Sequence, residues 1–127
     1  MKSRSINATD GPAASGGYSQ AFEVEGARRI LHISGQIPVE ADGSVPKEFE
    51  TQARLAWKNI ERQLVAAGMG LENIVKHTTF LSDREYRAAN SKVRQEVLGR
   101  LSPALTVIIA DIFDASWLLE IEAVAMD

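Results

Sequence analysis

The sequence predicts an α+β fold in which two helices pack on one face of a mixed six-stranded sheet. Residues 102–111 are apolar at nearly every position and rich in β-branched side chains, and residues 117–125 alternate, so both runs are typical of strands. Between residues 48 and 67 apolar residues recur every three or four positions, which is the period of an amphipathic helix. Two helices can cover one face of such a sheet only.

Length and composition favour a single domain spanning residues 1–127. The chain has 127 residues and is 45% hydrophobic, which is enough for a real core. It contains no cysteine, which excludes disulfides and thiol chemistry, and no apolar run reaches membrane-spanning length. The first residues lack the apolar core of a signal peptide, so we expect a cytoplasmic protein with no membrane partner. A net charge of −3 gives no electrostatic reason to expect nucleic acid.

The N-terminal part predicts short strands and flexible connections. Lys2–Asn7 has the pattern of an edge strand, and Ala8–Gly17 is a loop rich in Gly, Pro, Ala and Ser. Ala21–Glu25 and Arg29–Ser34 both alternate, and a turn around Gly26 separates them. Two alternating runs around a tight turn predict a β-hairpin.

The central part predicts helix, strand and helix. The amphipathic pattern of Glu48–Ala67 ends at Gly68, the residue type preferred just after a helix. Ile74–Leu81 predicts a third core strand. Residues 82–85, Ser-Asp-Arg-Glu, have the form of a capping box that opens a second helix, and Gly99 ends that helix.

The two C-terminal strands predict an oligomer. In 102–111 neither face is polar, so we expect both faces to be covered. In 117–125 one face is fully apolar, and the other carries Glu120 and Glu122 among apolar residues. Because the helices cover only one side of the sheet, a second copy of the chain is expected to cover the other.

An ordered set of short motifs resembles the YjgF/RidA family over almost the whole chain. Each motif is weak alone, and their order and spacing make the set specific. The motifs are Gly17-Tyr18-Ser19-Gln20-Ala21, Ser34-Gly35-Gln36-Ile37-Pro38, Asn59-Ile60 with Leu64 and Ala67-Gly68, Glu72-Asn73-Ile74-Val75-Lys76, Asn90, Pro103-Ala104 and Glu120-Ile121-Glu122-Ala123-Val124-Ala125.

The resemblance implies a chorismate-mutase-like subunit of the bacillary type in a homotrimer. The sheets would line the interior of the trimer, and small-molecule clefts would lie between neighbouring subunits. The best-known members hydrolyse reactive enamines and imines, such as 2-aminoacrylate, to the keto acid and ammonia. They need no metal or organic cofactor.

One position departs from the family's deaminases. They carry Pro-Ala-Arg, whose arginine holds the substrate carboxylate in two parallel hydrogen bonds. This chain has Leu105 after Pro103-Ala104, and leucine cannot bind a carboxylate. We therefore expect little activity on 2-aminoacrylate. Arg100 is a candidate replacement, although an arginine near the end of a helix more often serves that helix end.

The resemblance implies a catalytic residue and several ligand contacts. Glu120 would orient or activate a water and pass a proton; the alternative is that Glu120, like Glu122, only forms hydrogen bonds across a subunit interface. Tyr18 would close over a ligand, or would anchor the N-terminal segment. Asn90 interrupts a helix, where it would face the cleft or be solvated.

Ser34 and Gly35 end a strand at a point where glycine permits a close approach of the backbone and exposed amides can bind an anion.

His32 and His77 are the only histidines, and no spacing of His and carboxylates predicts a metal site. Eight aromatic residues scattered through an acidic chain do not form a platform for RNA.

Two function classes remain open from the sequence. The first is an altered or weak enamine/imine deaminase, which the retained Glu120 favours. The second is a binding protein that keeps the cleft for a metabolite or partner without catalysis, which Leu105 favours.

Overall fold

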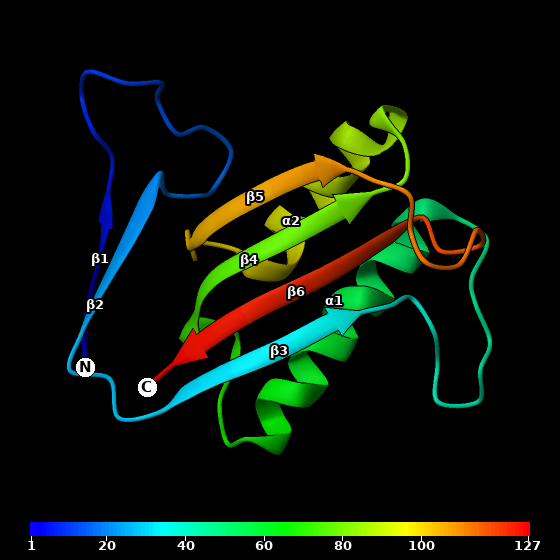
Figure 1. The fold of residues 1–127 in the computed structure, drawn as a ribbon, viewed down its shortest axis with the longest axis horizontal. Coiled ribbons are helices and arrows are strands. Elements are labelled where there is room, and N and C mark those ends of the chain that lie inside the picture. The colour runs from blue at the N-terminus through cyan, green and yellow to red at the C-terminus, as the bar shows by residue number, and fades with distance from the viewer.

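A computed structural model describes all residues, 1–127, and contains the predicted six strands and two α-helices (Figure 1). This confirms the α+β class with both helices packed on a mixed set of strands. The elements are β1 (Lys2–Ile6), β2 (Ala21–Glu25), β3 (Ile30–Gln36), α1 (Phe49–Ala66), β4 (Ile74–Leu81), α2 (Arg87–Leu98), β5 (Ala104–Ile109) and β6 (Leu119–Met126).

The six strands are divided between two hydrogen-bonded sheets. Four of them form a sheet in the order β3-β6-β4-β5, and β1 pairs with β2 in a separate antiparallel ribbon. β4 and β5 run parallel because α2 connects them, whereas β6 is antiparallel to both β3 and β4. The loop that connects β1 to β2 contacts the start of β5. Ser19 of this loop forms a bridge with Ala104, and its amide donates to the Pro103 carbonyl oxygen at 3.2 Å.

The hydrophobic core lies between the four-stranded sheet and the two helices, which Figure 1 shows on one side of the sheet. The apolar positions that define the predicted helical period in α1 are buried, and so is the clean apolar face of β6. The largest fully buried apolar side chains are Trp57, Ile60, Leu64, Leu81, Leu119 and Ile121. The sequence pattern therefore assigned the inner face of β6 correctly.

The ends of the helices follow their local sequence, with one correction. Gly68 has a φ of +73°, and the Met69 amide donates to the Leu64 carbonyl oxygen at 2.8 Å, so α1 ends as predicted. The predicted cap of the second helix at Ser82 is wrong by one residue. Asp83 is the extended residue, and its side chain accepts a hydrogen bond from the Glu85 amide at 2.8 Å. A short 3-10 turn, Arg84–Tyr86, then precedes α2.

The predicted hairpin between β2 and β3 is wrong, because each strand pairs elsewhere. β2 pairs with β1, where Arg4 lies opposite Glu23, and β3 pairs with β6. The amides of Arg28 and Arg29 donate to the carbonyl oxygen of Asp127, which fixes the start of β3 beside the end of β6. In this position Ile33 of β3 is buried in the core beneath the helices. The alternating pattern predicted both strands correctly, but burial of their side chains determines which strands pair.

The face of the sheet opposite the helices is uncovered in the single chain. The register aligns Glu120 of β6, Phe80 of β4 and Ile108 of β5 in one row on this open face. Ile108 is 43% exposed, and Ile30 of β3 is 57% exposed. That another copy of the chain covers this face stays a prediction.

A buried histidine on β4 predicts a pH dependence of stability. His77 is 1% exposed beneath Trp57, with ring centroids 5.0 Å apart, and neither of its ring nitrogens has a hydrogen-bond partner. Burial, followed by the charges of Arg94 and Lys76, lowers the pKa of His77 from 6.5 to about 3. The folded chain therefore keeps His77 neutral at pH values where the unfolded chain protonates it.

We expect the free energy of unfolding to decrease as the pH falls below 6.5. The unfolded state binds the extra proton in this range, and the loss approaches about 1.4 kcal/mol per pH unit until the folded-state pKa is reached. Urea unfolding of the wild type and His77→Leu at pH 7, 6 and 5, at one protein concentration, measures the effect. The variant should lose less stability on acidification, and parallel curves would contradict the assignment.

Candidate functional site

A cavity of about 470 Å³ lies along β5, the edge strand of the sheet, beside α2 and the segment that precedes β2. Three of the predicted site residues, Tyr18, Asn90 and Leu105, lie together in its wall. The full lining is Tyr18, Gln20, Arg87, Asn90, Ser91, Arg94, Leu105, Thr106 and Val107. We call this the edge cavity. Arg100 is not among these residues.

Two glycines and a buried serine place Tyr18 in the edge cavity. Gly16 and Gly17 have φ values of +81° and +80°, a conformation that favours glycine. The carbonyl oxygen of Gly16 accepts a hydrogen bond from Arg94 Nη2 at 2.6 Å, which ties the loop to α2. On the other side of Tyr18, the Ser19 hydroxyl donates to the Ser102 carbonyl oxygen at 2.5 Å. The loop that the sequence predicts to be flexible is thus anchored on both sides of the ring.

One face of α2 supplies the polar wall of the edge cavity. Asn90 and Ser91 each lie three or four residues from both Arg87 and Arg94, so the four side chains share this face. Asn90 is 4% exposed, so the alternative of a solvated asparagine is wrong. The sequence reasoning missed both arginines. Their spacing from Asn90 is the signal that could have found them.

A second group of predicted residues forms around Glu120. Gly35 lies at an irregularity in the pairing of β3 with β6, between Ile33 and Gln36. A methyl group built on Gly35 would lie 2.0 Å from Glu120 Oε2, so the carboxylate rests directly against the glycine backbone. Glycine is therefore needed at position 35 because the side chain of Glu120 approaches the backbone too closely to leave room for a Cβ atom. Ser34, one residue earlier, is exposed.

Glu120 also lines a smaller cavity, of about 290 Å³, together with Phe80 and the segment after β5. The lining is Phe80, Ala110, Asp111, Ile112, Phe113 and Glu120. We call this the Glu120 cavity. Phe113 at its rim is 95% exposed. Glu122, two residues from Glu120 on the same strand face, is exposed and lines neither cavity.

Within one chain, the predicted site residues therefore form two separate groups. Tyr18, Asn90 and Leu105 lie in the edge cavity, whereas Gly35 and Glu120 lie together at the other. No residue lines both cavities.

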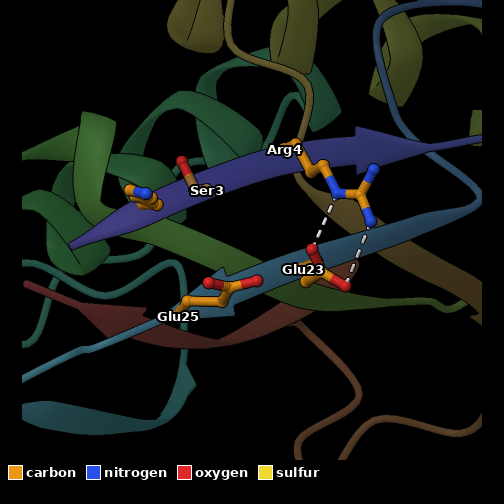
Figure 2. A pocket seen from close by; sticks show the side chains of 5 residues that line it. Ser3, Arg4, Glu23 and Glu25 are labelled. Carbon is orange, nitrogen blue, oxygen red and sulfur yellow. Dashed lines mark hydrogen bonds and ion pairs between the residues drawn. The ribbon is translucent and has the colours of Figure 1, made fainter.

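A third hollow, of about 440 Å³, lies on the β1–β2 ribbon, away from both groups (Figure 2). Lys2, Ser3, Arg4, Glu23 and Glu25 line it, and none of them is apolar. Figure 2 shows Arg4 and Glu23 pointing toward each other across the two strands, with Arg4 Nε 2.7 Å from Glu23 Oε1. Because Arg4 and Glu23 already pair with each other on an exposed surface, this hollow is a weak candidate for a ligand-binding site.

No group of three His, Cys, Asp or Glu side chains in the chain is arranged to hold a metal ion. Neither helix is both long and apolar enough to cross a bilayer.

Comparison with known proteins assigns the chain to a family. The family model described as Endoribonuclease L-PSP matches residues 8–127, which include both groups of site residues. The chain belongs to this family. The match confirms the resemblance to the YjgF/RidA family, because solved neighbours of the same fold are described as members of the conserved Rid protein family.

Individual members of the endoribonuclease L-PSP family support the assignment. The mouse protein named 2-iminobutanoate/2-iminopropanoate deaminase is 34% identical over 124 residues, which cover 95% of this chain and 89% of the relative. The Rid-family protein YyfB from Yersinia pestis, of unknown function, matches the fold with a TM-score of 0.87 at 26% identity and covers 100% of both chains. TdcF from E. coli, solved with bound serine, gives a TM-score of 0.72 at 30% identity over 98% of both chains.

Proposed function

We propose that this protein is an imine or enamine deaminase with altered substrate preference. The observation that carries the proposal is the placement of Glu120, whose carboxylate lies against Gly35 and beside an open cavity. The mouse relative is named as an imine deaminase, which supports the same reaction class. We further propose that residues 1–127 act as one cytoplasmic domain without a metal or organic cofactor and without a nucleic-acid partner.

The reaction requires a water and one group that can move a proton. A water molecule attacks the carbon of the C=N bond, and the Glu120 carboxylate accepts a proton from that water. Glu120 then returns the proton to the nitrogen, which gives a carbinolamine. Glu120 next moves the proton of the new hydroxyl group to the same nitrogen, so that the C=O bond forms and the C–N bond breaks to give a carbonyl compound and ammonia. No ion pair of the chain engages Glu120, so its carboxylate is free for this role.

The working unit in this proposal is a homotrimer with three shared sites. The open face of the sheet carries exposed apolar residues such as Ile108, and covering it with other copies removes that surface from water. The Glu120 cavity of one subunit would then meet the edge cavity of its neighbour. This pairing supplies a reason for the separation of the two groups within one chain.

A second candidate is a small-molecule binding protein that retains the cavities without catalysis. Leu105 favours it, because a leucine in the wall of the edge cavity cannot hold a carboxylate at that position. Both candidates share the trimer and the cavity. They differ only in whether Glu120 transfers a proton in a reaction.

Position 105 provides a test of substrate preference. We expect the wild type to deaminate 2-aminoacrylate poorly and Leu105→Arg to do so about 10- to 100-fold faster, the value of one charge-assisted hydrogen-bonding pair. Ammonia release above the spontaneous rate measures this. Leu105→Met keeps the apolar character and similar volume, so it serves as the matched control and should not gain activity. A trimeric Leu105→Arg that gains nothing would mean that the cavity differs at more than this position.

The deaminase proposal itself is tested on a wider panel of substrates. Imines of several 2-amino acids, generated in the assay by an amino-acid oxidase, should release ammonia faster when the wild-type protein is present. Failure with every imine, by a protein that still binds the corresponding 2-keto acids in calorimetry, would establish the binding-protein alternative.

A further inference from the structure

Arg94 is a buried cation without an acidic partner. The residue is 6% exposed, and it lines the edge cavity from α2 beside Asn90 and Leu105. Arg87, on the same helix face, is also in the cavity wall, and no carboxylate lines this cavity. Neither arginine takes part in the ion pairs of the chain, which join other arginines and lysines to surface carboxylates.

The hydrogen bonds of Arg94 leave its charge uncompensated. Nη2 donates to the Gly16 carbonyl oxygen at 2.6 Å and to the Ser91 hydroxyl at 3.2 Å, and both acceptors are neutral. Nε is buried and has no partner at all. Burial lowers the pKa of Arg94, which shows that its surroundings disfavour the charged form. Apart from Arg94 Nε, the only buried side-chain nitrogens without a partner are those of His77.

An anion in the edge cavity would correct this imbalance. A buried charge costs several kcal/mol unless an opposite charge and hydrogen bonds accompany it, and a guanidinium matches a carboxylate better than any other side chain does. The loop carbonyl of Gly16 holds the guanidinium in place before a ligand arrives, so little side-chain freedom is lost on binding.

We propose that Arg94 is the anion-binding residue of the edge cavity, with Arg87 as a second cation in the cavity wall, and that the ligand carries a carboxylate. This inference rests on the proposed function of the same cavity and specifies its substrate class. The anion is held from α2 and not from position 105 of β5, so a 2-imino acid binds in a different place from one held at position 105. The poor turnover expected for 2-aminoacrylate then reflects this placement and not a lack of anion binding. In a 2-imino acid the reacting carbon is bonded directly to the carboxylate, so the position of Arg94 sets where that carbon lies.

Calorimetric titration with 2-oxobutanoate tests the assignment. We expect the wild type to bind this anion and Arg94→Gln to bind it about 10- to 100-fold more weakly. Arg94→Lys, which keeps the charge but loses the planar fork, should fall between the two. Arg100→Gln removes one positive charge outside the cavity and is the matched control, so its affinity should equal that of the wild type.

A second measurement does not depend on the folding of any Arg94 variant. The wild type should bind 2-oxobutanoate at least about 10-fold more tightly than the neutral amide 2-oxobutanamide, which has nearly the same shape. In addition, Leu105→Arg combined with Arg94→Gln should recover binding, because it returns a guanidinium to the same cavity wall.

The outcomes separate this inference from the proposed function. A wild type that deaminates imines, together with an Arg94→Gln variant that binds 2-oxobutanoate as tightly as the wild type, overturns the role of Arg94 and leaves the deaminase intact. Equal affinity for the acid and the amide also overturns it. If anion binding depends on Arg94 but the protein deaminates no imine, the anion-binding role of Arg94 is supported and the proposed deaminase activity is wrong.

Discussion

Glu120→Gln is expected to reduce imine deamination by about 100- to 10,000-fold, the usual contribution of a positioned general acid or base. The amide fills the same space beside Gly35 but cannot accept the proton of the attacking water. Binding of 2-oxobutanoate should change little, because the product needs no proton transfer. The loss should therefore appear in the rate of turnover and not in affinity.

Glu122→Gln is the matched control for this loss. Glu122 lies two residues from Glu120 on the same face of β6, is exposed, and lines neither cavity. It should keep wild-type activity. Equal effects of the two substitutions would mean that the carboxylates act through the assembly of the subunits and not through catalysis.

Ile108→Asp should dissociate the trimer. Ile108 lies on the open face of the sheet in the row of Phe80 and Glu120, and it is 43% exposed in the single chain. A trimer formed through this face would bury three added carboxylates in the row that already carries Glu120, and a buried charge without a paired partner costs several kcal/mol. Light scattering at micromolar concentration should report a monomer for the variant and a trimer for the wild type.

Val65→Asp controls for the addition of a charge at an exposed apolar residue. Val65 is 66% exposed on α1, on the opposite side of the sheet from Ile108, so this variant should remain a trimer. A wild type that is monomeric at micromolar concentration would contradict the oligomer. A trimeric Ile108→Asp would contradict the assignment of its interface to this face of the sheet.

The sequence was most informative where burial and local chemistry agree. The periodicity of α1 and the alternation of β6 assigned the inner faces correctly, because both elements face one core. The β2–β3 hairpin was wrong because pairing is decided by distant contacts: β3 must lie beside β6 for Ile33 to be buried. No local pattern in 21–34 carries that information.

The structure groups the candidate site residues differently from the sequence-based hypothesis. The resemblance brought Tyr18, Asn90 and Leu105 into one hypothesis with Glu120, and the structure separates Glu120 from the other three. Sequence order cannot show which residues meet across a subunit interface. Arg94 was missed because a basic residue on a helix is usually solvated, and only the structure shows that its guanidinium is buried.

Subunit mixing tests most directly whether active sites form between chains. Glu120→Gln lacks the proton carrier, and Leu105→Glu places a carboxylate in the edge cavity, so each variant alone should be inactive. Unfolding and refolding an equal mixture should restore about a quarter of wild-type activity, since about one site in four then combines an intact Glu120 with an intact neighbouring cavity. A refolded, trimeric mixture that is no more active than either variant alone would contradict shared sites.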